Sequence, residues 1–304
     1  MTCSELLRDF ITARRADGLR ESTLKGYTRV IGQLITYLGD CDPAEVSLDD
    51  LRRFLADYRT GHKPKTVYNA WVAIRSFWRY LSERGYENIA LRLTKPRHPS
   101  PPVNVPTQED IRRLLAACEY TAPSQGRRAP FRMRRPTAKR DKALLMLMVD
   151  TGMRLGEVAA LKVGDVDLET GRVLIRRAKA GKWRTVFISR PVIEALRAYW
   201  DERGARPDEP AFTTRTSKGM TGSEIYRRIR NIGKRAGVSI HPHALRHFFA
   251  TQYLRNRGDA ITLKRLLGHS TFSMVERYLQ IVDDDLRDAH RRASPLLSVL
   301  KEED

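Results

Sequence analysis

Cysteine is scarce in this chain, and its scarcity excludes two classes of protein. The three cysteines, Cys3, Cys41 and Cys118, are widely separated and match neither a metal-ligand spacing nor a disulfide framework. A secreted domain held together by disulfides and a cysteine-ligated metal centre are therefore not expected. Such cysteine usage is typical of a protein that works in a reducing cytoplasm.

Long hydrophobic runs are also missing, which excludes a membrane-spanning protein. The longest apolar segment, ALLMLMV at residues 143–149, is far too short to cross a bilayer and predicts a buried helix instead. Residues 1–20 interleave charged and apolar side chains, which indicates an amphipathic helix rather than a signal peptide.

Acidic residues are few relative to basic ones. Lys and Arg number 56 against 36 Asp and Glu, so the formal net charge is +20. Such an excess costs self-repulsion unless a polyanion neutralises it. The charge favours nucleic acid as the partner, with an anionic membrane or a protein kept soluble by charge alone as alternatives.

The length of 304 residues is sufficient for two domains with separate cores. Residues 95–106, KPRHPSPPVNVP, lack a helical period, and their prolines favour an extended, semi-rigid connection. We therefore expect a helical domain at residues 1–98, a proline-rich linker at 99–106 and a second domain at 107–304. In the first domain, Ser47 and Asp50 form a capping box that predicts a helix start, and apolar residues recur at helical spacing from Thr66 to Leu81.

The second domain is predicted to combine helices with a small antiparallel sheet. Residues 172–177 (RVLIRR) and 185–188 (TVFI) alternate and are rich in β-branched side chains, with a turn at Ala180 and Gly181. Capping boxes and helical periods predict helices after Thr107 and at residues 189–200, 221–236, 243–255, 262–267 and beyond Asp283. The expected fold class is mainly α, with an α+β second domain.

An irregular basic stretch runs from Tyr120 to Arg140. It can be interpreted as a DNA-facing loop or as a solvated insertion, because charge runs are usually exposed. Its basic residues are Arg127, Arg128, Arg132, Arg134, Arg135, Lys139 and Arg140.

The residues that could act on a phosphodiester stand in a distinct order. In the expected helix that begins near His243, the side chains of His243, Arg246 and His247 fall on one side. A glycine that ends a helix precedes His269, where the chain turns. The full order is Arg154 in TGMRLGE, Lys179 near the hairpin tip, His243 and Arg246 in HALRH, His269 in LGH, and Tyr278 nine residues later.

This order resembles the active site of the tyrosine recombinases, the family of phage integrases, Xer recombinases and Cre. The resemblance runs through both domains and is strongest from residue 143 to residue 280. It implies a helical, SAM-like core-binding domain followed by a catalytic domain. The chain departs from the usual family pattern at Met274 and Val275, where many members have threonines.

The resemblance implies that the Tyr278 hydroxyl attacks DNA, leaving a 3′-phosphotyrosine and a free 5′-hydroxyl on the way to a Holliday junction. Neither metal nor ATP would be needed. Arg154 and Arg246 would hold the phosphate through forked donors and stabilise the charge of the transition state, with His269 as a third donor.

Proton transfer would require further residues. By the family pattern Lys179 is the general acid for the departing 5′-oxygen, and His243 assists proton transfer at Tyr278. Lys182 would take the acid role if the hairpin register differs. His247 is expected to support the fold.

Structural roles remain open for the same side chains. Arg154 could cap a helix C-terminus, Arg246 could pair with Glu157, and Tyr278 could be a half-buried aromatic residue at a helix start. A type IB topoisomerase shares the tyrosine chemistry, and an inactive DNA-binding protein is the alternative from another class.

Double-stranded DNA with a specific recombination site is the implied partner, bound by a homo- or hetero-tetramer with accessory proteins. The tail, residues 283–304, carries an apolar cluster too small to form its own core and would dock on a neighbouring protomer. Phosphate contacts or, alternatively, plain solvated faces are expected at Lys63, Lys65, Arg75, Arg227, Arg228 and Lys234.

Overall fold

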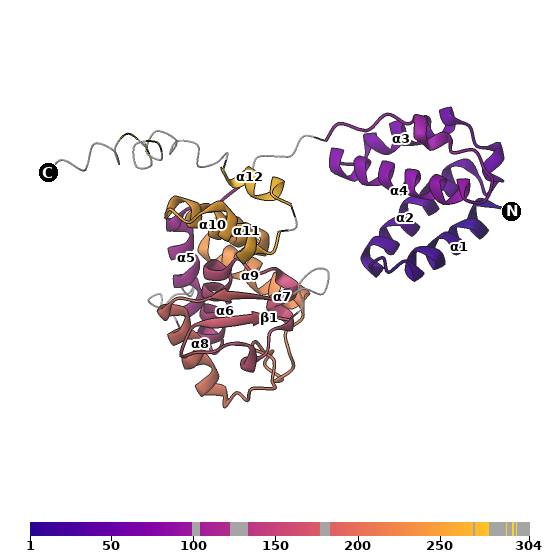
Figure 1. Cartoon of the computed structure of the whole chain (residues 1–304). Helices are drawn as coiled ribbons and strands as arrows, with labels where there is room; N and C mark the ends of the chain where they lie inside the picture. The colour runs from indigo at the N-terminus through magenta and orange to yellow at the C-terminus, as the bar shows by residue number, and fades with distance from the viewer. Residues whose placement is uncertain are drawn as a thin grey trace, which may run out of the picture. The chain divides into compact units, whose positions relative to one another are not determined.

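The computed structural model describes residues 1–98, 104–121, 133–176, 183–269 and 271–279, together with His290, Ser294 and Leu296. The chain divides into two compact units, Met1–Pro102 and Val103–Asp304, each with its own hydrophobic core (Figure 1). Among the described residues, no helix combines the length and the apolar composition that crossing a bilayer requires.

The first unit is a bundle of helices around α4 (Pro64–Ser82). Its helix caps follow the sequence: Ser47 and Asp50 form the expected capping box, and Pro64 occupies the first turn of α4. The predicted helix between Thr66 and Leu81 is confirmed within α4. The elements are α1 (Cys3–Ala16), α2 (Glu21–Leu38), a 3₁₀ turn (Pro43–Glu45), α3 (Leu48–Thr60), α4 (Pro64–Ser82) and a second 3₁₀ turn (Ile89–Arg92).

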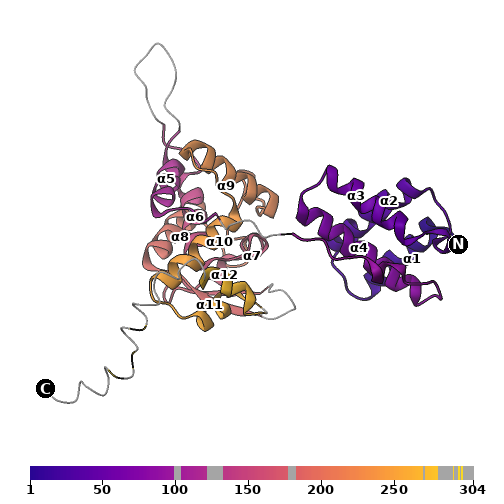
Figure 2. The ribbon, with the colours of Figure 1, turned by 90° about the horizontal axis from the view of Figure 1, so that it is seen from above.

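The second unit is built around α6 (Ala138–Thr151). This helix lies among α5 (Gln108–Glu119), α8 (Arg190–Arg203) and α10 (Pro242–Arg255) (Figure 2). The apolar segment at residues 143–149 belongs to this helix and is largely buried, as predicted. The helices are α5 (Gln108–Glu119), α6 (Ala138–Thr151), α7 (Leu155–Ala160), α8 (Arg190–Arg203), α9 (Gly222–Ala236), α10 (Pro242–Arg255), α11 (Ala260–Leu267) and α12 (Ser273–Leu279), with a 3₁₀ turn at Val163–Asp165.

The predicted antiparallel sheet is confirmed as β1 (Arg172–Ile175) paired with β2 (Arg184–Phe187). Val186 on β2 is buried in the core of the second unit, and its neighbours in sequence point the other way. Arg184 shares the inward face with Val186. The sheet therefore directs an arginine toward the helices.

The basic stretch from Tyr120 to Arg140 is corrected at its end. Residues 122–132 lie outside the described residues, but Arg140 belongs to α6 and is only 5 % exposed. Its guanidinium donates hydrogen bonds to Asp141 and to the Thr213 carbonyl. The prediction of a DNA-facing side chain is therefore wrong for Arg140, because the charge is neutralised inside the unit.

Candidate active site

The C-terminal end of α11 organises the site. Gly268 ends the helix in the left-handed conformation, with φ of 64°, and thereby turns the last carbonyls away from the helix ladder. A β-carbon at this glycine would come within 3.1 Å of an arginine side chain. Three consecutive carbonyls each accept a hydrogen bond from a different arginine: Leu266 from Arg184 Nε at 2.8 Å, Leu267 from Arg246 Nη2 at 2.8 Å, and Gly268 from Arg154 Nη2 at 2.9 Å.

Arg246 is the most buried of these arginines, with 3 % exposure. It projects from α10, and its Nη1 also donates to the carbonyl of Gly152, at the C-terminus of α6, over 2.7 Å. Burial, followed by the charge of Arg154, lowers the pKa of Arg246 to about 10. The guanidinium is therefore still charged at neutral pH and is held in one orientation by backbone oxygens.

Glu157 supplies the negative charge of the site. Its carboxylate accepts hydrogen bonds from the Arg154 backbone N–H at 2.7 Å, from Arg154 Nη1 at 3.1 Å, and from Arg184 at 2.6 and 2.8 Å. Burial would raise the pKa of Glu157, but hydrogen bonds from Arg184 and the nearby guanidinium charges outweigh it and lower the pKa. Glu157 thus pairs with Arg154 and Arg184, not with Arg246.

His269 completes the cluster around Arg246. Its Nε2 lies 2.8 Å from Arg246 Nη2, and because a guanidinium can only donate, the imidazole nitrogen accepts. Burial, and then the charges of Arg246 and Arg154, lower the pKa of His269 to about 4. The ring is therefore neutral with its proton on Nδ1. This Nδ1 is buried and has no hydrogen-bond partner among the residues that the structure describes.

These side chains surround a cavity of about 340 Å³. Desolvation, and then the Arg246 charge, lower the pKa of His243 at this cavity. The structure thus brings together four predicted residues, Arg154, His243, Arg246 and His269. Two arginines with histidine donors can surround a tetrahedral anion. The lining is Met153, Arg154, Leu155, Tyr226, His241, Pro242, His243, Arg246, His269 and Met274.

Tyr278 is placed beside the cavity residues but not among the described residues that line the cavity. It belongs to α12, a helix that the sequence did not predict, and is only 4 % exposed. Its hydroxyl lies 2.8 Å from Nδ1 of His247. The His247 ring in turn meets the His243 ring, with centroids 4.1 Å apart. The imidazole next to the tyrosine oxygen in the structure is therefore His247. The part in proton transfer that the resemblance implies for His243 stays a prediction.

One site residue, Arg184, was missed by the sequence analysis, and it pairs with Glu157 across the fold. His247 was expected only to support the fold, and it contacts the Tyr278 hydroxyl. Arg184 carried one signal, because it is an arginine two residues before the inward-facing Val186 of a strand. Lys179 and Lys182, the alternative general acids, lie outside the described residues.

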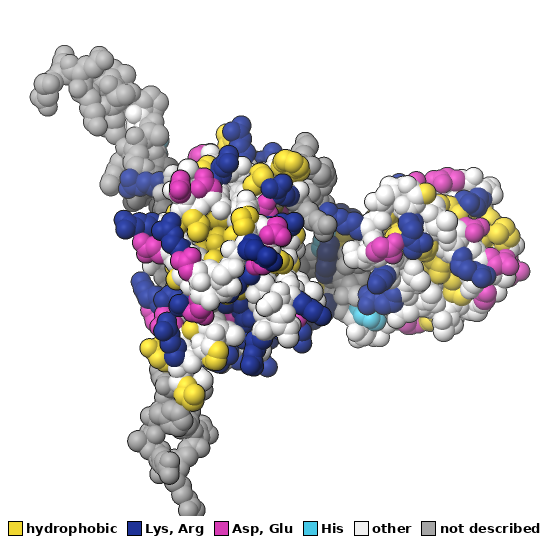
Figure 3. Space-filling model, turned by 90° about the horizontal axis from the view of Figure 1, so that it is seen from below, with side chains coloured by type: hydrophobic (Ala, Val, Ile, Leu, Met, Phe, Trp, Pro, Cys, Tyr) yellow, Lys and Arg dark blue, Asp and Glu magenta, His cyan; other side chains and the backbone are white. Residues whose placement is uncertain are grey.

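The expected phosphate-binding residues differ in accessibility. Lys63 and Lys65 are exposed around the start of α4, and Arg75 covers the Trp71 ring at 4.9 Å. On α9, Arg227 and Lys234 are exposed, but Arg228 is half-buried with Nη1 3.5 Å from Asp141. Figure 3 shows Lys and Arg side chains spread over one face of the larger unit.

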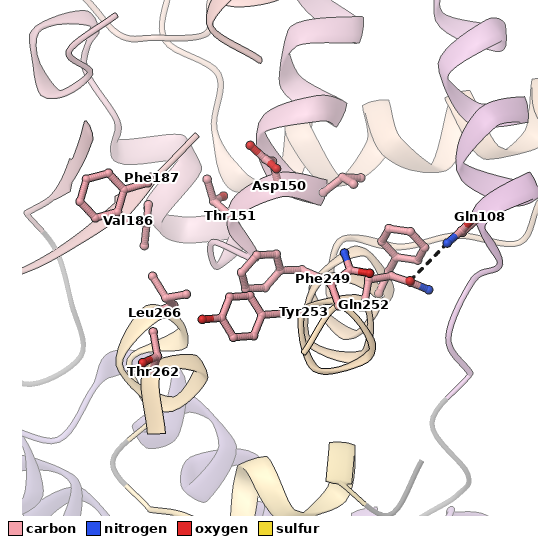
Figure 4. A pocket seen from close by; sticks show the side chains of 13 residues that line it. Gln108, Asp150, Thr151, Val186, Phe187, Phe249, Gln252, Tyr253, Thr262 and Leu266 are labelled. Atoms are coloured by element: carbon pink, nitrogen blue, oxygen red, sulfur yellow. Dashed lines mark hydrogen bonds between the residues drawn. The ribbon is translucent and has the colours of Figure 1, made fainter. Parts of the chain in front are cut away.

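A second cavity of about 640 Å³ is mainly apolar. It lies where the ends of α6, α10 and α11 approach β2, and Figure 4 shows the rings of Phe249 and Tyr253 next to each other within it. At one side Gln108 Nε2 donates to Gln252 Oε1 over 3.4 Å. Phe187, another lining residue, is 61 % exposed.

Comparison with family models gives two matches. Residues 104–284 match the model described as the phage integrase family. Residues 6–88 match the model described as the phage integrase N-terminal SAM-like domain.

Curated relatives cover nearly the whole chain. Tyrosine recombinase XerA of Thermococcus kodakarensis is 28% identical, over 98% of this chain and 99% of the relative. Tyrosine recombinase XerC of Xanthomonas campestris is 30% identical, over 90% of this chain and 83% of the relative.

Solved structures show the same fold. A crystal structure of XerA recombinase is similar with a TM-score of 0.53, 26% identity, and coverage of 96% of this chain and 99% of that chain. XerH recombinase bound to a palindromic difH substrate gives a TM-score of 0.72 at 22% identity, over 97% and 84% of the two chains. A lambda integrase tetramer bound to a Holliday junction gives 0.73 at 16% identity, over 91% and 77%.

Proposed function

The chain belongs to the phage integrase family, as a Xer-like tyrosine recombinase, and we propose that it cleaves and rejoins DNA at a specific site with Tyr278 as its nucleophile. The observation that carries this assignment of residues is the cavity in which Arg154, Arg246 and His269 converge. A scissile phosphate would occupy this cavity.

The cavity suits the transition state of phosphoryl transfer. Attack on phosphorus concentrates negative charge on the non-bridging oxygens, and fixed donors in a water-poor site stabilise that charge most effectively. Arg246 is oriented by the Gly152 and Leu267 carbonyls, so its charge needs no reorganisation when the phosphate arrives. The protonated Nδ1 of His269 adds a neutral donor.

The chemistry of cleavage conserves the energy of the bond. The Tyr278 oxygen forms a bond to phosphorus as the bond to the 5′-oxygen breaks, leaving a 3′-phosphotyrosine. The phenolic proton of Tyr278 must leave, and we assign its removal to His243. The departing 5′-oxygen must gain a proton, which Lys179 or Lys182 would donate. Attack by a 5′-hydroxyl of another strand reverses these changes. One ester replaces another at each step, so the exchange requires no ATP.

Both units would contact DNA phosphates. We assign Lys63, Lys65 and Arg75 to this role in the first unit and the exposed Arg227 and Lys234 in the second, with the linker at 99–106 allowing both to close on the duplex. Arg228 would contribute less, because Asp141 already neutralises part of its charge. Specific base contacts would decide the target site.

An oligomer on DNA, working in the cytoplasm, is the proposed functional state. The relatives include a tetramer on a Holliday junction, and the same state for this chain would be a homo- or hetero-tetramer. The tail at 283–304 would then place its apolar residues in the 640 Å³ cavity of the neighbouring protomer. Leu296, one of these residues, is 63 % exposed in the single chain. If a chain that ends before Pro295 assembles on DNA and exchanges strands normally, this docking does not occur.

The proposal is tested by trapping covalent protein–DNA complexes. The protein is expressed in the cells that encode it, and the DNA attached to it after denaturation is sequenced to recover a site. A nicked duplex carrying that site should then accumulate covalent complexes with the native protein and none with Tyr278→Phe. Retained trapping in Tyr278→Phe would exclude this nucleophile.

Two further outcomes separate the alternatives. A protein that only binds DNA would trap no strand at all. A type IB topoisomerase would trap DNA and relax supercoils but would not exchange strands between two copies of the site. A recombinant product from a two-site substrate therefore distinguishes recombination from relaxation.

A further inference from the structure

Two of the three cysteines meet in the first unit, although they are far apart in the sequence. Cys3 is the first residue of α1, and Cys41 follows the end of α2. The backbone N–H of Cys3 donates a hydrogen bond to the Cys41 carbonyl over 2.9 Å. Cys3 is only 3 % exposed, and the half-buried Cys41 packs against the core of the first unit.

The capping of α1 brings these two cysteines together. Gly39, with φ of 83°, ends α2 and turns the chain, so that the residues after it reach the start of α1. The first backbone N–H groups of a helix have no partner within the helix. Here the Cys41 carbonyl accepts from the Cys3 N–H, and Asp40 Oδ1 accepts from the Ser4 N–H over 2.9 Å. The pair is therefore held in place by contacts that do not involve a bond between the sulfurs.

The separation of the two backbones suits a disulfide. Paired residues that share backbone hydrogen bonds in sheets have Cα atoms about 5.5 Å apart, and disulfides join Cα atoms about 4.4–6.8 Å apart. The side chains meet as well, because burial, and then the charge and hydrogen bond of the Cys41 thiol, raise the pKa of Cys3 to about 12. Both cysteines are free thiols in the structure. A bond between their sulfurs would need little movement of the backbone.

We propose that Cys3 and Cys41 are a redox-active thiol pair, which a low-molecular-weight disulfide converts into an intramolecular disulfide bond. This inference does not depend on the proposed function. Disulfides in the cytoplasm are usually transient and redox-sensing. The pair would stay reduced in a reducing cytoplasm, and it would join the start of α1 to the end of α2 when small disulfides accumulate.

The exchange has two steps. The thiolate of Cys41, which is the more accessible residue, attacks one sulfur of the small disulfide, and a small thiolate leaves. The thiolate of Cys3 then attacks the Cys41 sulfur, and the second small thiolate leaves. The two cysteines lose two protons and two electrons in total, which convert the small disulfide into two thiols. Burial keeps the Cys3 thiol protonated at neutral pH, so Cys3 is assigned to the second step.

The fold should favour this bond by a measurable factor. A disulfide stabilises a folded domain mainly by restricting its unfolded chain, and the usual gain in the folding equilibrium is about 30- to 1,000-fold. By a thermodynamic cycle, the equilibrium constant for oxidation exceeds that of the unfolded chain by the same factor. Cysteines that serve only as small apolar side chains would show an equal or smaller constant in the folded chain.

The first experiment measures this factor in the full chain carrying Cys118→Ala, so that no third thiol can pair in the unfolded state. Cys118 is buried in the second unit, where its Sγ donates to the Leu114 carbonyl. The chain is equilibrated with reduced and oxidised glutathione, with and without urea, and the bridged fraction is measured by mass spectrometry after the thiols are blocked. If Cys118→Ala does not fold, the native chain is used and peptide mapping identifies the bridge.

The expected result is a bridge between residues 3 and 41 that forms about 30- to 1,000-fold more readily in the folded chain than in urea. An equal or smaller equilibrium constant in the folded chain would overturn the proposal.

Single variants test the order of attack. Cys3→Ala should retain one glutathione on Cys41, because no second thiol can displace it. Cys41→Ala should stay unmodified while folded, because Cys3 is 3 % exposed. A Cys3→Ala chain without the adduct, or a folded Cys41→Ala chain that carries it, would contradict the two steps given above.

A third measurement tests what the bridge does to the fold. In the oxidised chain, the slowest backbone amides of α1 and α2 should exchange their hydrogens about 30- to 1,000-fold more slowly than in the reduced chain. Amides of α6, which lies in the second unit, serve as the internal control and should not change. Equal exchange in the oxidised and reduced forms of α1 and α2 would refute the stabilising role.

Discussion

Replacement of Glu157 tests whether one buried carboxylate organises the cation cluster, which consists of Arg154, Arg184 and Arg246. The Glu157 side chain is 4 % exposed and that of Arg184 is 10 % exposed, so their pairing is largely shielded from solvent. Glu157→Ala would leave a buried guanidinium unpaired and should cost about 3–5 kcal/mol of unfolding free energy. Glu157→Gln keeps the shape but not the charge and should cost about 1.5–3 kcal/mol. The Arg154 side chain is 34 % exposed, so solvent screens its ion pair with Glu157, and this pair contributes less to the unfolding free energy than the pair with Arg184.

The loss of unfolding free energy on replacing Glu157 should become smaller as the pH falls. Burial opposes ionisation of Glu157, but Arg184 and Arg154 lower its pKa in the folded state below the ordinary value of 4.5. The stabilisation is therefore fully present above about pH 4.5 and is lost as the pH falls through the folded-state pKa. The difference in unfolding free energy between native protein and Glu157→Gln should be largest at neutral pH and shrink below 4.5.

Urea unfolding of the native chain and the variants across this pH range provides the measurement. A matched control is Glu194→Gln, because Glu194 is 61 % exposed and pairs with Arg190, which is 88 % exposed. That pair should contribute about 0.5 kcal/mol or less. The reasoning would be refuted if Glu157→Gln were no more costly than Glu194→Gln, or if its cost did not vary with pH.

Further predictions concern the arginines. Arg246→Lys should lower the single-turnover cleavage rate by about 100-fold with little change in DNA affinity, because a lysine cannot serve two carbonyls and a phosphate together; an equal loss of affinity, measured by titration, would contradict this. Arg227→Ala should reduce the slope of log affinity against log salt by about 1 without altering thermal stability. Arg228→Ala should lower the thermal midpoint and change the salt slope less, because it leaves Asp141 short of a partner; the reverse pattern in the two α9 variants would disprove the distinction.

Local signals in the sequence predicted much of the fold. The apolar run at residues 143–149 is the buried core of α6, and the Ser47 and Thr107 capping boxes mark the starts of α3 and α5. These features depend on neighbours within one or two turns, which is why a single sequence reveals them. Helix α12 was missed because seven residues give too short a period to recognise.

Contacts between distant segments could not be predicted in the same way. Arg140 seemed part of an exposed basic run, but its guanidinium reaches Thr213, which is 73 residues away. Likewise Arg184 meets Glu157 across 27 residues, and His247 meets Tyr278 across 31. A charge pattern gives no indication of which charges will be neutralised by partners that only the tertiary fold supplies.

The cation cluster shows how a folded protein can keep a binding site for negative charge although the positive charges in that site repel one another. Among the described contacts, Glu157 is the one carboxylate that pairs with Arg154 and Arg184, and no carboxylate pairs with Arg246, so the cluster of three arginines retains a net positive charge. Backbone carbonyls supply the remaining negative charge. Carbonyls at the C-terminal end of α11 accept hydrogen bonds from all three arginines, and the carbonyl that follows α6 accepts one from Arg246. The C-terminal end of a helix carries partial negative charge. Carbonyls stabilise a guanidinium without neutralising it. A second carboxylate in their place would have stabilised the free protein equally well and repelled the phosphate.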